Sequence, residues 1–259
     1  MAWTKMKTAF AAATAILLVA GTTILAFKKV QKHEFNDSWR TQDVFSGFKK
    51  LEQVPPQVRI LPSKFHSKGH WLTSHGKTMG TAEPAGIIVQ AAYGCEFSHR
   101  VVLTTCLPAG RYDFIANLSE GNPAALQQRV KQEFGVVAKW KELETNVLLL
   151  TVGFPDVPGL SPAAKKQPSA EIFGQTMYAV VDKPLTNLVN FLEAQSDVPV
   201  IDQTGLTGHF DFTLKWREPG MQPSQGIPYP LKQAMLNQLG LELVPGVARV
   251  EMLVVEKAE

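Results

Sequence analysis

Two segments about a hundred residues apart share one pattern, and this repetition constrains the fold more than any other feature of the sequence. Residues 109–118 read AGRYDFIANL, and residues 207–216 read TGHFDFTLKW. Each contains a glycine, a basic residue or histidine, an aromatic residue, an aspartate and a phenylalanine, and then continues as a β-strand. The same order of elements is therefore expected in both halves of the chain.

A helix is expected after each of these two strands. Apolar residues four apart form one helix face, and a glycine follows the last of them, as is typical of a helix C-terminus. Asn122 and Pro123 supply a cap and a first-turn proline for the first helix. The residues of the two patterns are Leu126, Val130, Phe134 and Gly135 in the first half, and Leu231, Met235, Leu239 and Gly240 in the second.

Each half is predicted to contain a strand, a helix, a strand, a helix and two further strands. The predicted fold class is α+β, with two tandem, duplicated small modules after an N-terminal hydrophobic helix. The two last strands are predicted at 136–140 and 146–152 in the first half, and at 241–244 and 248–256 in the second.

Two proline-rich stretches mark the boundaries of these modules. Pro55 and Pro56 exclude a helix, and residues 57–61 then alternate like an edge strand. Four prolines between 154 and 171 are typical of a linker. The predicted organisation is a signal peptide or membrane anchor at 1–29, a tether at 30–55, a first α+β module at 56–154, a linker at 155–170 and a second α+β module at 171–259.

The first segment of the chain has the length and composition of a membrane-spanning helix. Residues 8–27 contain no charged residue, with two lysines before them and three after them. A helix of this length reaches about 30 Å, the thickness of the apolar core of a bilayer. The length and the following lysines favour an uncleaved anchor over a signal peptide. A strict lysine count favours a cytoplasmic body, but the alanine-rich start resembles an export signal, so we expect a periplasmic body.

Charge and cysteine content argue against some functions. The chain has 26 basic and 23 acidic residues and a net charge of +3, which gives no basis for nucleic-acid binding. Cys95 and Cys106 are the only cysteines, and without a CxxC motif a structural zinc site has no support. Both a disulfide between them and two free thiols are compatible with the sequence.

Several stretches together resemble a known family. The stretches PVIDQTGLTGHFDFTLKW (199–216), LKQAMLNQLGLELVPG (231–246) and LPAGRYDFIAN (107–117) resemble a family of uncharacterised envelope proteins abundant in soil Acidobacteria and Verrucomicrobia, whose domain has no known function. The resemblance covers roughly 56–259 and implies an export signal or anchor. Some relatives carry the domain after a membrane metallopeptidase of the antibiotic-sensor type, but this chain has no HExxH motif. The family implies no catalytic residues.

The stretch that begins at Asp202 is the strongest candidate for a site in the sequence. It is similar to the Asp-Thr-Gly of aspartic proteases with one residue inserted, but those enzymes need two such carboxylates. The corresponding stretch of the first half, 104–110, has no aspartate. A turn held by side-chain to backbone hydrogen bonds is therefore favoured. If one module has a binding site, the candidate residues are Asp202, Thr204, Gly205, Thr207 and Asp211.

Two further groups of polar residues have a structural and a functional interpretation. Asp113 and Asp211 each lie between two aromatic residues, where they either face solvent or hold a neighbouring loop, or else contact a ligand twice. His66, His70 and His75 carry the residue type that most often binds zinc or copper, although their spacing of four and then five matches no standard site. A solvated hairpin is favoured for this stretch.

The sequence supports binding more than catalysis. It contains no GxGxxG, P-loop or GxSxG motif, and no cofactor is predicted. We expect a membrane-anchored or secreted envelope protein whose two modules bind a protein or peptide partner, with exposed strand edges as the means of recognition. The alternatives left open are a hydrolase-type enzyme that uses Asp202 and a metal-binding envelope protein that uses His66, His70 and His75.

Overall fold

The computed structural model of the chain describes residues 37–154, 159–163, 168–217 and 226–259. The predicted anchor at 8–27 and much of the predicted linker lie outside the described residues. Within these ranges, no helix is both long and apolar enough to cross a membrane. The described part combines helices with three four-stranded sheets, which agrees with the predicted mixture of α and β structure.

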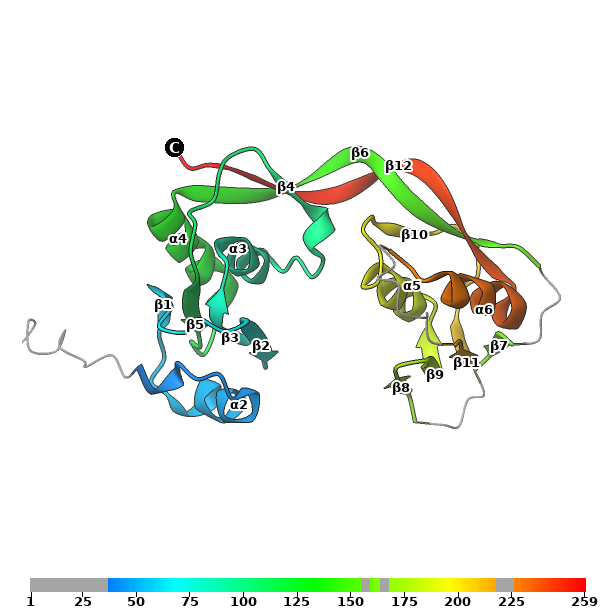
Figure 1. The fold of residues 1–259 in the computed structure, drawn as a ribbon, viewed down its shortest axis with the longest axis horizontal. Helices are drawn as coiled ribbons and strands as arrows, with labels where there is room; N and C mark the ends of the chain where they lie inside the picture. Colours follow the sequence, from blue (N-terminus) through cyan, green and yellow to red (C-terminus); the bar gives the residue numbers. More distant parts are fainter. Residues whose placement is uncertain (1–36, 155–158, 164–167, 218–225) are drawn as a thin grey trace, which may run out of the picture.

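Two of the sheets lie at opposite ends of the molecule (Figure 1). The first end sheet contains, in spatial order, β1 (Val58–Pro62), β5 (Tyr112–Ala116), β3 (Lys77–Glu83) and β2 (His70–Ser74). The second end sheet contains, in spatial order, β7 (Ser161–Pro162), β11 (His209–Lys215), β9 (Met177–Pro184) and β8 (Ala170–Phe173). The predicted edge strand at 57–61 is confirmed as β1.

A central sheet spans both halves on one side of the molecule and connects them (Figure 1). It contains, in spatial order, β10 (Val200–Asp202), β6 (Val136–Val152), β12 (Leu241–Lys257) and β4 (Val101–Leu103). The strands β6 and β12 pair antiparallel along their whole length, from Val136 opposite Lys257 to Val152 opposite Leu241. The short strand β10 runs parallel to the C-terminal end of β6, and the short strand β4 runs parallel to the C-terminal end of β12.

The prediction of two strands after each helix is wrong, because each predicted pair is one continuous 17-residue strand. The break was predicted where charged residues interrupt the apolar pattern of β6 and where Pro245 and Gly246 interrupt β12. In the structure Lys141, Glu142 and Glu144 are exposed, while their backbone pairs with β12. A two-stranded ribbon needs a hydrogen-bonding partner more than burial, so a loss of hydrophobicity does not end a strand.

Helices pack on both end sheets, and the short helix η2 lies against β12 of the central sheet. Those of the first half are η1 (Asp37–Trp39), α2 (Val44–Gln53), α3 (Ala85–Tyr93), η2 (Ser98–Arg100) and α4 (Asn122–Phe134). Those of the second half are α5 (Thr186–Glu193) and α6 (Tyr229–Leu239). Gly135 and Gly240 end α4 and α6 in the left-handed conformation, as predicted. The predicted cap is wrong, because Gly121 is the N-cap and the Asn122 side chain binds the backbone of Leu118 instead.

Each half has its own hydrophobic core. Each core also includes residues of a long strand that begins in the other half. The predicted apolar faces are buried: Leu126 and Val130 lie in the first core, and Leu231, Met235 and Leu239 lie in the second. The first core also contains Leu253 and Val255 of β12, and the second contains Leu150 of β6. The strands β6 and β12 therefore connect the two cores.

Candidate functional site

The stretch that begins at Asp202 forms a tight exposed turn after β10. The Asp202 Oδ1 accepts hydrogen bonds from the backbone amide of Thr204 at 2.9 Å and from its hydroxyl at 2.7 Å. The Thr204 Oγ1 in turn accepts one from the amide of Leu206 at 3.1 Å. Gly205 has φ +69, as the turn prediction requires. These contacts account for the polar side chains of the turn without a ligand, and exposed Thr207 lies just beyond it.

Asp211 does not belong to this turn, because it lies on β11 and its carboxylate points to the neighbouring strand β9. The Asp211 Oδ1 accepts a hydrogen bond from the backbone amide of Asp182 at 2.8 Å. Asp182 is a non-glycine residue with φ +53, next to an irregularity in the pairing of β9 with β11. Asp211 therefore supports a strained backbone position, which agrees with the interpretation that this aspartate holds a neighbouring segment.

Asp113 makes the equivalent contact in the first half. Its Oδ1 accepts a hydrogen bond from the amide of Ala82 at 2.8 Å, and Ala82 has φ +54. Its Oδ2 accepts one from Arg40 Nε at 2.6 Å. The carboxylate is fully buried, so the alternative in which Asp113 faces solvent is wrong, and the alternative in which it holds a neighbouring segment agrees with the structure. The partner Arg40 lies 73 residues away in the chain, and nothing in the local sequence pattern indicates it.

The three histidines do not form a metal centre. His75 and Gly76 form the turn between β2 and β3, which confirms the predicted hairpin. His70 lies on β2 and is half-buried, whereas His66 is exposed. Among the residues that the structure describes, no group of three or more histidine, cysteine, aspartate or glutamate side chains is gathered to hold a metal ion.

The two cysteines are not joined by a disulfide. Both are free thiols: Cys95 is buried and Cys106 is exposed. Burial raises the pKa of the Cys95 thiol above its usual value, which keeps it protonated.

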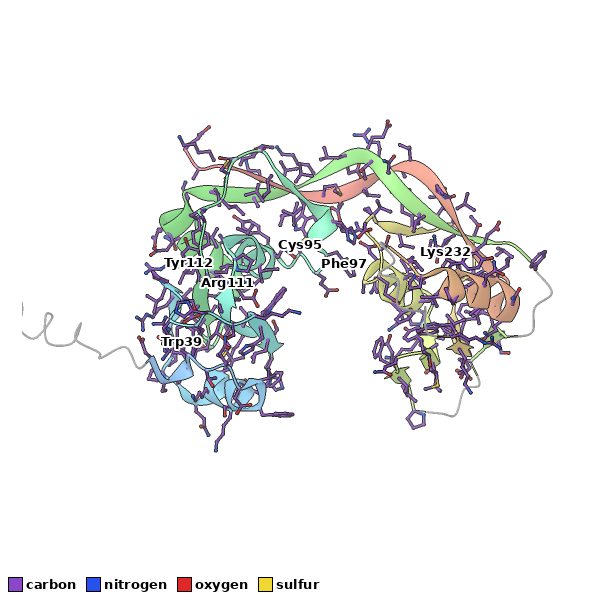
Figure 2. The ribbon with its side chains drawn as sticks, in the orientation of Figure 1. Trp39, Cys95, Phe97, Arg111, Tyr112 and Lys232 are labelled. Atoms are coloured by element: carbon purple, nitrogen blue, oxygen red, sulfur yellow. The ribbon has the colours of Figure 1, made fainter. Side chains whose placement is uncertain are left out.

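A groove of about 470 Å³ lies where the two halves meet under the central sheet. One wall is formed by the edge strand β8 and by α5. The other is formed by Glu96 and Phe97, on the segment that follows α3. Figure 2 shows Phe97 on this segment, facing the second half. The residues that line the groove are Glu96, Phe97, Glu171, Phe173, Asn187, Asn190, Phe191, Ala194 and Gln195.

Aromatic rings make up the apolar part of the groove wall. Phe191 stacks on the buried ring of Tyr178 with a centroid distance of 4.1 Å, and Phe173 lies 5.2 Å from Tyr178. Phe173 is 64% exposed, so an apolar surface is open to a ligand. Burial and the neighbouring Glu171, which accepts its hydroxyl hydrogen, raise the pKa of Tyr178, so this phenol does not ionise in the physiological range.

Polar groups complete the groove. The other carboxylate oxygen of Glu171 accepts a hydrogen bond from Asn187 Nδ2 at 3.0 Å, which fixes this carboxylate between β9 and α5. Asn190 is exposed on the same face of α5. The lining residues include two carboxylates and no lysine or arginine. The groove therefore combines an aromatic surface with two carboxylates and no basic side chain.

Glu193 of α5 lies beside the groove and connects the two halves through its carboxylate. Its buried carboxylate accepts hydrogen bonds from Arg100 Nη2 at 2.8 Å, from the Val200 amide at 3.1 Å and, when that nitrogen is protonated, from His99 Nε2 at 3.1 Å. Burial raises the pKa of Glu193, but the hydrogen bonds from Arg100, His99 and Val200 outweigh burial and bring the pKa to about 2. The carboxylate is thus charged and fixes η2 against α5 and β10.

A second hollow of about 250 Å³ extends the groove toward this carboxylate. It shares Glu96, Phe97 and Asn190 with the groove and reaches Trp140 of the central sheet. None of the groove residues was identified from the sequence. Their only signal was a polar residue, Asn187 or Asn190, beside the apolar stripe of α5, and such residues are usual on a solvent-exposed helix face.

The described residues form a mixed α/β structure with a groove between its two halves. Residues 87–258 match the family described as a protein of unknown function (DUF3738). The match covers more than half of the chain, so the chain belongs to this family. No curated protein and no solved structure matches the chain.

Proposed function

We propose that this chain is a membrane-anchored or exported envelope protein that binds an extended segment of a protein or peptide and performs no chemistry on it. The observation that carries the proposal is the groove between β8, α5 and Phe97. Its volume of about 470 Å³ falls in the range of ligand sites, which is about 300–1,000 Å³. Envelope location is supported by the charge-free segment 8–27 and by the family resemblance.

The backbone of β8 supplies the first part of this recognition. β8 is an edge strand, because β9 pairs with it on one side and no strand of the described residues pairs with it on the other. An extended peptide that adds to this edge would place alternate side chains toward α5. Main-chain hydrogen bonds give such a complex affinity that is largely independent of peptide sequence.

The side chains of the groove supply selectivity. Phe97, Phe173 and Phe191 favour an apolar or aromatic residue of the partner, because its burial removes these rings from water. Glu96 and Glu171 favour a lysine or arginine beside it. The preferred segment therefore has an apolar and a basic residue two positions apart, because every second side chain of an added strand faces the groove.

We also propose that the two halves arose by duplication of one module. Elements β8, β9, α5, β10, β11, α6 and β12 follow the order of β2, β3, α3, β4, β5, α4 and β6. Glu144 and Arg249, the ninth residues of β6 and β12, lie opposite each other, so the ribbon is symmetric about this pair. Asp113 and Asp211 hold equivalent positive-φ residues.

Site-specific photo-crosslinking in cells tests the binding proposal. A benzoylphenylalanine placed at Phe173 of the full chain should give a reproducible adduct with a partner. The matched control places the same residue at Tyr229, which is 70% exposed on α6 and does not line the groove. Equal adducts from the two positions, or none from Phe173, would refute binding in the groove.

A blocking substitution makes the test specific. Asn190→Trp fills the groove from an exposed position of α5, so it should remove the adduct without lowering the melting temperature. Thr186→Trp, at an exposed position on the same helix outside the groove, should leave the adduct unchanged.

A further inference from the structure

The helix α2 has apolar side chains on a face that it does not use for packing. Gly47 and Leu51 are buried against the first end sheet. Val44 is 41%, Phe45 is 88% and Phe48 is 43% exposed. A single exposed apolar residue needs no explanation, but three on one short helix form a continuous patch that favours an apolar partner.

The position of α2 along the chain indicates what that partner is. Nine residues, 28–36, separate the charge-free segment 8–27 from Asp37, where the described structure begins. Nine residues span about 30 Å when fully extended. Arg59 and Arg40 bind Asp37 and Asp113, which fixes η1 to the first end sheet. The first half of the molecule, including α2, therefore stays close to the end of segment 8–27.

The charges around the patch suit an anionic surface. Lys49 is exposed on α2 beside Phe45 and Phe48, and the loop from β1 to β2 carries exposed Lys64 and Lys68. This loop reaches the start of α2 through a hydrogen bond between the side chains of Ser67 and Gln42.

Two acidic residues of this region have local structural roles. Asp43 caps α2 by accepting hydrogen bonds from the amides of Phe45 and Ser46, and Glu52 pairs with Lys77. Lysines around an apolar patch are typical of helices that lie on anionic lipid headgroups.

We propose that α2 lies on the surface of the membrane, with Phe45 and Phe48 inserted between the lipid headgroups. This inference rests on the membrane anchor included in the proposed function. Figure 1 shows α2 on the side of the first half that faces away from the central sheet. The central sheet therefore points away from the bilayer, and the groove binds segments that are exposed close to the membrane surface.

Spin-label accessibility in vesicles of phosphatidylethanolamine and phosphatidylglycerol tests this orientation. The full chain carries Cys106→Ser, which leaves only buried Cys95, and one label at Lys49→Cys on α2. The control label is at Val247→Cys, which is 62% exposed in the middle of the central ribbon. The α2 label should collide several-fold more with oxygen than with a water-soluble nickel complex, and the ribbon label should do the reverse.

The outcomes separate this inference from the proposed anchor. Adding Phe45→Ser and Phe48→Ser should make the α2 label as accessible to nickel as the ribbon label, while the chain still floats with the vesicles. A chain that floats but whose α2 label is fully accessible to nickel overturns the inference and leaves the anchor standing. A chain that does not float overturns the anchor and the inference together.

Discussion

The carboxylate of Asp113 holds the backbone amide of Ala82 at 2.8 Å, and Ala82 has the left-handed backbone conformation, with φ +54. Asp211 makes the same contact with Asp182, which has φ +53. A left-handed conformation costs a non-glycine residue about 1–2 kcal/mol. In both end sheets the repeated aspartate thus compensates for a strained residue that bends the adjacent strand.

Removing the carboxylate of Asp113 should destabilise the protein strongly. Asp113→Ala leaves the Arg40 guanidinium and the Ala82 amide without this buried partner, which should lower the free energy of unfolding by about 3–5 kcal/mol. Asp211→Ala, at a half-buried position, should cost only about 1–2 kcal/mol. Denaturant unfolding of the two variants checks this, and equal losses would contradict the importance of the buried ion pair.

Relieving the strain at Ala82 should have the opposite effect. Ala82→Gly removes the steric cost of φ +54 and loses only one buried methyl group. The free energy of unfolding should rise by up to about 1 kcal/mol, or at least not fall. Ala234→Gly, at a buried position in the middle of the helix α6, is the matched control and should destabilise by about 1 kcal/mol.

The stability of the protein should depend on pH through Glu193. Its pKa is about 2 in the folded protein and 4.5 in the unfolded chain, so the unfolded state binds the proton first as the pH falls. The stabilisation is complete above pH 4.5, is lost between pH 4.5 and about 2, and amounts to about 3 kcal/mol.

Thermal unfolding of Glu193→Gln between pH 2 and 6 measures this contribution. The variant should be less stable than the wild type at neutral pH and should lose less stability on acidification. Glu256→Gln removes an exposed carboxylate that pairs with Lys141, and it should keep most of the wild-type dependence. If Glu193→Gln and the wild type have parallel curves, the folded-state pKa of Glu193 is not depressed.

Asp202 should matter for the turn and not for a reaction. Asp202→Asn keeps an oxygen that accepts the Thr204 hydrogen bonds, so it should leave both the melting temperature and the photo-crosslinked adduct unchanged. Asp202→Ala should cost about 1 kcal/mol. An Asp202→Asn variant that loses an enzymatic activity at an unchanged melting temperature would favour the hydrolase alternative.

The two thiols should differ in reactivity. Cys106 is exposed and should react rapidly with a disulfide reagent in the native protein. Cys95 is buried and its pKa is raised by burial, so it should react only after unfolding. Titration before and after addition of denaturant distinguishes the two, and rapid reaction of both native thiols would contradict the buried position of Cys95.

Local sequence patterns predicted several helices and strands, although α2 lies in the stretch that was predicted as a tether. Apolar residues four apart placed α4 and α6, and the glycines at 135 and 240 marked their ends, because these signals depend on neighbouring residues only. The same reasoning wrongly divided β6 and β12 into two strands each, because a hydrophobic pattern indicates only which residues are buried. The exposed residues in the middle of both strands remain extended because their backbones pair with each other.

The candidate groove could not be predicted in this way. Phe97 comes from the segment after α3, Phe173 from β8 and Asn190 from α5, and only the packing of the two halves brings them together. The buried carboxylate of Glu193 could not be predicted either, because its partner Arg100 is 93 residues away in the chain.

The sequence by itself determined the helices α4 and α6, the edge strand β1, the aspartate that recurs in both halves and the hairpin at His75, because each depends on residues close together in the chain. Only the tertiary structure decided that Asp113 is buried, that β6 and β12 are continuous, and that a groove forms between β8, α5 and Phe97. These features depend on contacts between segments that are distant in the chain. The free energy that stabilises them comes from the removal of side chains from water and from strand pairing, and neither can be read from neighbouring residues.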